Sequence, residues 1–214
     1  GVQTCALPIF LQICAVVMVL AALPPELRIV SALPWWIERA LLLFGCLWLV
    51  NLTNFMDGID WITTAEVVPV AATLAILGFI GALPAYSAVV ALALCGAMLG
   101  FAPFNRPVAK LFLGDVGSLP IGLLLGWLLI LLAGNGHLAA ALLLPLYYLA
   151  DATITLFRRL MNGERVWEAH RSHFYQRATT GGFKVIEIVA RIFVVNISLA
   201  VLAFVTVHWL SPLD

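Results

Sequence analysis

Long apolar runs alternate with short polar segments along the chain. A helix needs about 20 apolar residues to cross a bilayer, and turn-forming residues such as Pro24, Gly81 and Gly136 separate runs of this size. The pattern predicts seven crossing helices, at about residues 5–23, 39–56, 62–81, 85–104, 118–134, 137–157 and 185–210. We therefore expect an all-α fold, a polytopic transmembrane helix bundle that forms one integral membrane domain over residues 1–214.

The composition agrees with a membrane protein and not with a water-soluble domain. Hydrophobic residues make up 64% of the chain and charged residues only 10%, and the mean hydropathy is +1.09. The 11 basic and 11 acidic residues balance, so no net charge would recruit nucleic acid. The four cysteines occur singly, without the spacing of a disulfide framework or a zinc site.

Three polar segments interrupt the apolar pattern. We call them the first, second and third polar segments: residues 51–60 (NLTNFMDGID), 105–118 (NRPVAKLFLGDVGS) and 158–177 (RRLMNGERVWEAHRSHFYQR). Ionisable groups at the end of a membrane helix are costly, so function is the default explanation for them. Links after the second, fourth and sixth crossings emerge on one side, which predicts that the three segments form one site.

The basic residues predict which side this is. Only Arg28 and Arg39 fall on the opposite side, whereas the side of the polar segments carries Arg106, Lys110, Arg158, Arg159, Arg165, Arg171, Arg177, Lys184 and Arg191. Cytoplasmic loops of membrane proteins carry an excess of Lys and Arg. The site is therefore expected to face the cytoplasm.

The first polar segment offers oxygen ligands. Asn51, Asn54 and Asp57 recur every three residues near a helix end, which places them on one face, and Gly58 is expected to let the chain turn and present Asp60. Mg²⁺ prefers such hard oxygens and binds through one or two protein groups plus substrate phosphates. The alternative is an ordinary C-terminal cap followed by a polar turn.

The second polar segment ends in FLGDVGS, just before an apolar helix. Free N–H groups and the helix dipole favour an anion there, and Asp115 can hold a cation against it, so phosphate with Mg²⁺ is one interpretation. An ordinary helix start with Ser118 as N-cap is the other. Phe112 suits either a membrane anchor or a stacking face for a base. A rigid, basic approach to the same place is formed by Asn105, Pro107 and Lys110.

The third polar segment is the most basic. His170 and His173 are three residues apart, so a helical turn is expected to bring them to one side, with Arg177 a turn further on. Such a cluster suits a diphosphate. A zinc pair and an ordinary basic loop at the lipid headgroups are the alternatives. For Asp151, a structural hydrogen bond and a chemical role are both open.

Together these residues resemble the polyprenyl-phosphate N-acetylhexosamine-1-phosphate transferases of glycosyltransferase family 4. The resemblance lies in N-x-x-N-x-x-D-G-x-D at residues 51–60, in the Asn, Pro and F-x-G-D-x-G-S of residues 105–118, and in the histidine loop HRSH at residues 170–173. It spans nearly the whole chain beyond residue 40. The histidine loop looks closer to the branch that initiates lipopolysaccharide O-antigen than to the muramyl-pentapeptide branch.

The resemblance implies transfer of a sugar-1-phosphate from a UDP-N-acetylaminosugar to a polyprenyl (undecaprenyl) phosphate lipid, with release of UMP. This would be the first membrane step of cell-envelope polysaccharide synthesis, at the bacterial inner (plasma) membrane. Mg²⁺, with Mn²⁺ as a substitute, is the implied cofactor. A single chain and a homodimer are both compatible with the sequence.

The resemblance also implies roles for individual residues. Asn54 and Asp115 would hold the metal and the diphosphate, Phe112 would stack on uracil, and Asp60 would hydrogen-bond the base. The sugar-phosphate end would be held by His170, Arg171 and His173. We name Asp57 and Asp115 as the catalytic candidates, because phosphoryl transfer needs positioning and charge neutralisation. The further substrate-binding candidates are Asn51, Asn105 and Lys110.

Two departures from the family pattern lead to a further expectation. The family carries an adjacent pair of aspartates in an earlier loop and has about ten or eleven crossings, whereas this sequence contains no Asp-Asp. Residues 1–9 look like an atypical edge. We therefore expect this chain to be the carboxyl-terminal two-thirds of a longer enzyme, and we expect it to be inactive on its own. A flippase for lipid-linked sugars and an inactive membrane scaffold are the alternatives, although the helices between the polar segments carry few of the polar groups that a transport path requires.

Overall fold

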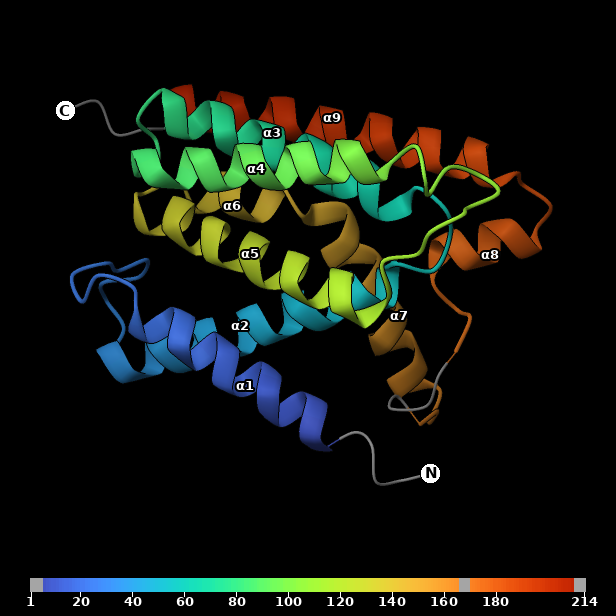
Figure 1. Cartoon of the computed structure of the whole chain (residues 1–214). Helices are drawn as coiled ribbons and strands as arrows, with labels where there is room; N and C mark the ends of the chain where they lie inside the picture. The colour runs from blue at the N-terminus through green and yellow to red at the C-terminus, as the bar shows by residue number, and fades with distance from the viewer. Residues whose placement is uncertain (1–5, 166–169, 210–214) are drawn as a thin grey trace.

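The computed structural model describes residues 6–165 and 170–209, which form helices with no strand among them. The helices are α1 (Ala6–Ala21), α2 (Trp35–Met56), α3 (Ile62–Phe79), α4 (Ala85–Phe101), α5 (Gly114–Gly134), α6 (Leu138–Leu143), α7 (Leu146–Met161), α8 (Phe174–Thr180) and α9 (Val185–Trp209). In Figure 1, α5 and α6 lie between the pair α1–α2 and the group of α3, α4 and α9. The expected all-α, polytopic bundle is confirmed.

Four helices are long and apolar enough to cross a membrane, namely α2, α3, α5 and α9. Two shorter apolar helices cover Leu7–Ala21 and Ala85–Phe101. Both α2 and α5 begin earlier than the expected residues 39 and 118, at Trp35 and Gly114. The turns expected at Gly81 and Gly136 are present, and both glycines have a positive φ, of 89° and 91°.

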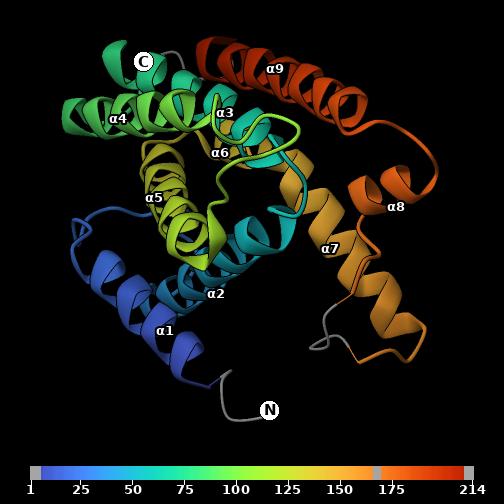
Figure 2. The same ribbon diagram turned by 45° about the vertical axis from the view of Figure 1, so that its right-hand side comes forward.

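The predicted continuous crossing at residues 137–157 is wrong. The chain forms the six-residue α6 and the 16-residue α7 instead, with a break at Leu144 and Pro145. Proline has no N–H for the helical hydrogen bond, and its ring clashes with the carbonyl four residues before it. Figure 2 shows the result, in which α7 points away from the bundle.

The two sides of α7 have opposite chemistry. Its buried residues form one stripe, consisting of Tyr148, Asp151, Ala152, Thr155 and Arg159. Large apolar side chains are exposed on the rest of the helix, at Ile154, Phe157, Leu160 and Met161. A helix between protein and lipid is expected to turn its polar side chains inward in this way.

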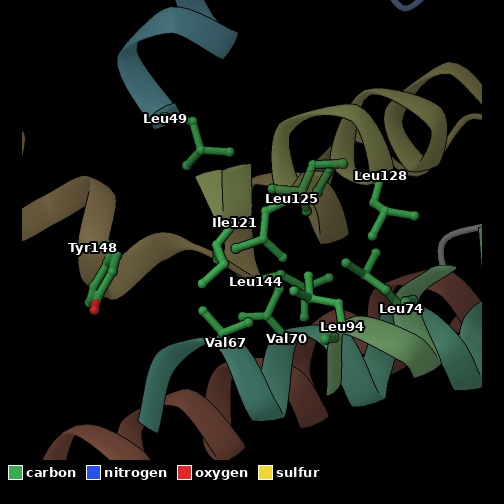
Figure 3. Packing of buried hydrophobic residues seen from close by; sticks show 14 of the residues in the cluster. Leu49, Val67, Val70, Leu74, Leu94, Ile121, Leu125, Leu128, Leu144 and Tyr148 are labelled. Atoms are coloured by element: carbon green, nitrogen blue, oxygen red, sulfur yellow. The ribbon is translucent and has the colours of Figure 1, made fainter. Parts of the chain in front are cut away.

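The core lies between α2, α5 and α3, where Leu49, Leu125 and Val70 come together with other buried side chains (Figure 3). Glycine sets the distance between α2 and α5. A Cβ atom on Gly122 would lie 2.7 Å from the Cα atom of Val50, and one on Gly126 would lie 2.7 Å from Cys46 Sγ. Small residues that allow backbones to approach are typical of helix contacts in membranes.

We expect Gly122→Ala to destabilise the protein, because the new methyl group would meet backbone that has little freedom to move. A cost of about 1–3 kcal/mol is typical of overpacking. Gly96→Ala in α4 is the matched control, since no atom lies within 4 Å of a Cβ built there. Thermal unfolding of the purified protein in detergent should show a lower melting temperature for Gly122→Ala only. Equal melting temperatures would contradict the close contact of α2 and α5.

Candidate functional site

The three polar segments meet at one end of the bundle. The right-hand side of Figure 1 shows the C-terminal end of α2, the N-terminal end of α5, and the helices α7 and α8. The links that follow α1, α3 and α5 lie at the opposite end of the bundle. We call the group formed by residues 51–60, 105–118 and 170–177 the polar mouth. Residues 166–169 of the third polar segment lie outside the described residues.

A side-chain contact between α2 and α5 joins the first two polar segments. Asn54 lies in the last turn of α2, and Asp115 lies in the first turn of α5. The Asn54 Nδ2 atom donates a hydrogen bond of 2.8 Å to Asp115 Oδ1. The exposed Asp115 carboxylate also lies where free N–H groups of a helix start stabilise negative charge.

Asn51 contacts a different helix. Its Nδ2 atom donates to Gln12 Oε1 on α1 at 2.9 Å and to the carbonyl of Leu47 at 2.8 Å. Asn51 and Asn54 were expected on one face of the helix, but they contact α1 and α5 respectively. The structure therefore brings Asn54, and not Asn51, to Asp115.

Asp57 caps the C-terminal end of α2 and is half-buried. Its Oδ1 atom accepts a hydrogen bond of 2.5 Å from Thr63 Oγ1, and Thr63 accepts one of 3.2 Å from the hydroxyl of Tyr148. Burial raises the pKa of Asp57, and the hydrogen bond from Thr63 lowers it only in part. Thr63 on α3 therefore holds the Asp57 carboxylate, and Tyr148 on α7 in turn holds Thr63.

The α4–α5 loop (residues 102–113) is fastened to the first polar segment by Asn105 and Asp60. The buried Asn105 accepts a hydrogen bond of 2.8 Å from the N–H of Trp61 through Oδ1, and its Nδ2 atom donates to the carbonyl of Leu111 at 2.9 Å. Asp60 Oδ2 accepts from the N–H of Ala109 at 3.1 Å. Both ends of the Asn105 amide are thus used inside the protein.

Trp61 has an unusual backbone conformation. Its φ of 66° lies in the left-handed region, where it is the one non-glycine residue with positive φ among residues 6–165 and 170–209. This conformation costs an L-residue roughly 1–2 kcal/mol. Its indole Nε1 donates a hydrogen bond of 2.6 Å to the carbonyl of Ala102. Strained residues of this kind persist where surrounding contacts hold them.

The outer part of the loop faces away from the protein. The side chain of Phe112 is 72% exposed, and Lys110 is exposed as well. Ser118, however, is not the N-cap of α5, because the helix already begins at Gly114 and the Ser118 hydroxyl donates within it to the Gly114 carbonyl at 3.0 Å. The exposure of Phe112 is compatible with both roles that the sequence left open, a membrane anchor and a stacking face for a base.

Gly58 lies where the chain turns between α2 and α3, as the sequence suggested, and it also makes a close contact. Its φ is not among the positive values found for the glycines of the described residues. A Cβ atom at this position would lie only 2.1 Å from the hydroxyl oxygen of Tyr175, and that hydroxyl donates to the carbonyl of Phe55 at 3.1 Å. The third polar segment therefore packs directly on the first.

His170 and His173 are neighbours, but no helical turn joins them. His173 is the N-cap of α8, whereas His170 precedes the helix. The two ring centroids are 4.9 Å apart, and the Tyr175 ring stacks on His173 with a centroid distance of 5.8 Å. His173 is buried beneath the more accessible His170. Burial and the charges of Arg159 and His173 lower the pKa of His170, so its neutral form is favoured.

Asp151 organises this segment through hydrogen bonds. Its Oδ1 atom lies 3.0 Å from the donating N–H of Phe174, 3.1 Å from His173 Nδ1 and 3.2 Å from the donating Thr155 hydroxyl. A small polar cavity beside these residues is lined by Thr155, Arg158, Arg159, Asn162, Glu164, Ser172 and Arg177. Of the two roles that the sequence left open for Asp151, the structural hydrogen bond is present.

Four residues at the polar mouth were not identified from the sequence, namely Trp61, Thr63, Tyr148 and Tyr175. Tyr148 and Tyr175 are fully buried although each carries a hydroxyl group, and buried tyrosines usually bind a polar partner. Their position near Asp151 and His173 in the sequence was the one available signal. Nothing in the sequence pattern distinguishes Thr63 from its neighbour Thr64.

Comparison with known proteins now identifies the family. The sequence pattern of glycosyl transferase family 4 matches residues 2–133, more than half of the chain. This chain is a member of glycosyl transferase family 4. The matched residues include the first two polar segments and the Asn54–Asp115 contact between them.

Individual relatives of this family 4 chain are transferases. It is 44% identical over 82 residues to a phospho-N-acetylmuramoyl-pentapeptide-transferase of Clostridium beijerinckii. The aligned region makes up 38% of this chain and 25% of the relative. It is 28% identical over 176 residues to a probable undecaprenyl-phosphate N-acetylglucosaminyl 1-phosphate transferase of Bacillus subtilis, over 77% of this chain and 49% of the relative.

A third relative, a phospho-N-acetylmuramoyl-pentapeptide-transferase of Pelagibacter ubique, is 29% identical over 171 residues, or 73% of this chain and 46% of the relative. The chain thus spans half or less of the length of these relatives. Because the relatives act on different sugars by name, the comparisons support the family and not one branch of it.

The donor atoms at the polar mouth of the family 4 chain fit Mg²⁺ better than zinc. The Asn54–Asp115 hydrogen bond uses Nδ2 and Oδ1, which leaves Asn54 Oδ1 and Asp115 Oδ2 as hard oxygen donors. Among the described residues, no three His, Cys, Asp or Glu side chains gather as a metal site. An amide and a carboxylate match the one or two protein ligands that Mg²⁺ takes beside substrate phosphates.

We expect Thr63→Val to raise the pKa of Asp57 further, because the substitution removes the hydroxyl that donates to the ionised carboxylate. At a given pH a larger fraction of Asp57 would then be protonated. Infrared titration of the carboxyl band, with Asp57→Asn as the subtracted reference, measures this shift. Thr64→Val is the matched control on the same helix, because Thr64 Oγ1 has no hydrogen-bond partner. Equal titration of both variants would contradict the Thr63 contact.

Proposed function

We propose that the family 4 chain transfers an N-acetylaminosugar-1-phosphate from a UDP-sugar to polyprenyl (undecaprenyl) phosphate. In this reaction an oxygen of the lipid phosphate attacks the phosphorus that carries the sugar. The bond from that phosphorus to the oxygen of UMP breaks, and UMP leaves with the bonding electrons. The observation that carries the proposal is the contact of Asn54 with Asp115, because it joins the first two polar segments through residues 61 positions apart in the sequence.

The metal and diphosphate end of the site is assigned to Asn54 and Asp115. Mg²⁺, or Mn²⁺ in its place, would supply neutralisation of the diphosphate charge. Asp115 orients the Asn54 amide by accepting its hydrogen bond. Asp57 lies three residues after Asn54 and keeps its second oxygen, Oδ2, available toward the reacting groups, since Thr63 occupies only Oδ1.

The nucleotide end is assigned to the α4–α5 loop and Asp60. The exposed Phe112 ring suits stacking on uracil, and Lys110 adds a positive charge near the diphosphate. Asp60 uses Oδ2 for the N–H of Ala109, so Oδ1 is the atom for the base. Asn105 contributes by fastening this loop, and Asn51 contributes from the α1 side of the mouth.

The sugar-phosphate end is assigned to the third polar segment. His170 and the exposed Arg171 are the groups that reach the ligand, and His173 supports His170 from below through ring contact at 4.9 Å. The excess of basic residues at this end of the bundle supports a cytoplasmic site in a bacterial inner membrane. HRSH in place of consecutive histidines supports the O-antigen branch.

Mg²⁺-dependent binding of UDP-N-acetylglucosamine to the purified chain tests the proposal. We expect Asp115→Asn to weaken this binding about tenfold or more, because a hydrogen bond or metal contact of a charged group contributes roughly 1.5–3 kcal/mol. Titration calorimetry with and without a chelator gives the two affinities. Glu26→Gln is the matched control, because that exposed carboxylate lies at the other end of the bundle.

Assay of the reaction itself separates the proposal from its rivals. Membranes that contain the chain are supplied with Mg²⁺, UDP-N-acetylglucosamine and undecaprenyl phosphate, and release of UMP is followed. UMP release that Asp115→Asn removes would support the transferase, and it would overturn the expectation from the sequence that this chain is inactive alone. Movement of a lipid-linked sugar into sealed vesicles without UMP would support a flippase instead, and loss of neither binding nor UMP release in Asp115→Asn would refute the assigned roles.

A further inference from the structure

The α4–α5 loop has little apolar anchoring of its own, and Leu113 at its end is its one large apolar side chain that packs against the core. Of residues 102–113 only Asn105 is buried, and four large apolar side chains of the loop are exposed, at Phe104, Val108, Leu111 and Phe112. A segment that buries so little apolar surface gains little from the hydrophobic effect. Between Ala102 and Phe112, the position of the loop within the polar mouth therefore depends mainly on hydrogen bonds to the rest of the protein.

Trp61 and its neighbours supply those hydrogen bonds at both ends of the loop. The indole of Trp61 donates to Ala102 at the start of the loop, and its backbone N–H donates to Asn105. Asp60, the preceding residue, accepts from Ala109 near the other end. Two consecutive residues between α2 and α3 thus tether three points of the loop.

We infer that Trp61 is a positioning residue that holds the α4–α5 loop in place at the polar mouth, so that Lys110 and Phe112 face a bound nucleotide. The left-handed backbone of Trp61 supports this inference, because such strain persists where the contacts around it are numerous and is common at functional sites. Trp61 does not itself touch the ligand in this arrangement. The inference rests on the proposed function only for the identity of the nucleotide.

Hydrogen exchange of the full chain measures the tether without any ligand. Trp61→Phe keeps an aromatic ring and removes only the indole N–H. We expect the amides of Ala109, Lys110 and Leu111, which donate to Asp60 and Phe104, to exchange roughly two to ten times faster, as expected for loss of one hydrogen bond. Trp48→Phe is the matched control, because the Trp48 indole donates to Thr153 on α7 instead.

Nucleotide binding measures the positioning role. Trp61→Phe should weaken Mg²⁺-dependent binding of UDP-N-acetylglucosamine while its melting temperature stays near that of Trp48→Phe. If Trp61 acts through the loop, Trp61→Phe and Phe112→Leu together should weaken binding by less than the product of their separate effects. A purely structural role would lower the melting temperature without this coupling.

The outcomes separate the two claims. Equal exchange in Trp61→Phe and Trp48→Phe would overturn the tether, whatever the protein binds. Faster exchange with unchanged nucleotide affinity would overturn the positioning role. Failure of the unmodified chain to bind the nucleotide would refute the proposed function and, with it, a positioning role toward that nucleotide. The hydrogen-exchange result would still establish or refute the tether.

Discussion

The close contact between α2 and α5 determines the geometry of the polar mouth. In a membrane, lipid chains are as apolar as leucine, so helices associate through packing and not through removal from water. Gly122 and Gly126 permit that packing because any side chain there would meet Val50 or Cys46. Asn54 lies one turn beyond Val50 on α2, and Asp115 lies two turns before Gly122 on α5. The close approach of the two helix backbones is therefore consistent with the direct contact of Asn54 with Asp115 at their ends.

A second set of contacts adds the remaining helices to this pair. Thr63 on α3 and Tyr148 on α7 are joined by a hydrogen bond of 3.2 Å behind Asp57, and Asp151 holds the beginning of α8. Polar groups away from water are stabilised only when they find partners, and partly paired networks are costly. The polar groups at this end of the bundle thus form a connected structure in which one helix cannot move far without disturbing the next.

The sequence predicted the helices better than the contacts. Apolar runs of the required length are a local property, and six of the expected crossings correspond to single helices. The presence of a proline at position 145 did not by itself predict a helix break, because Pro69 and Pro120 lie inside the intact helices α3 and α5. The meeting of the three polar segments was predictable from helix parity. The partners of Thr63 and Gly58 were not, because Tyr148 and Tyr175 come from distant parts of the chain.

The short α8 has a consequence for how the third polar segment behaves. With seven residues it is well below the length at which a helix forms in isolation. It exists because Asp151 receives the first N–H of the helix, from Phe174, and because Tyr175 fits against the bare backbone at Gly58. We therefore expect α8 to lose its helical form if it leaves the bundle, because the contacts that hold it lie on α7, at the end of α2 and on the link between α2 and α3.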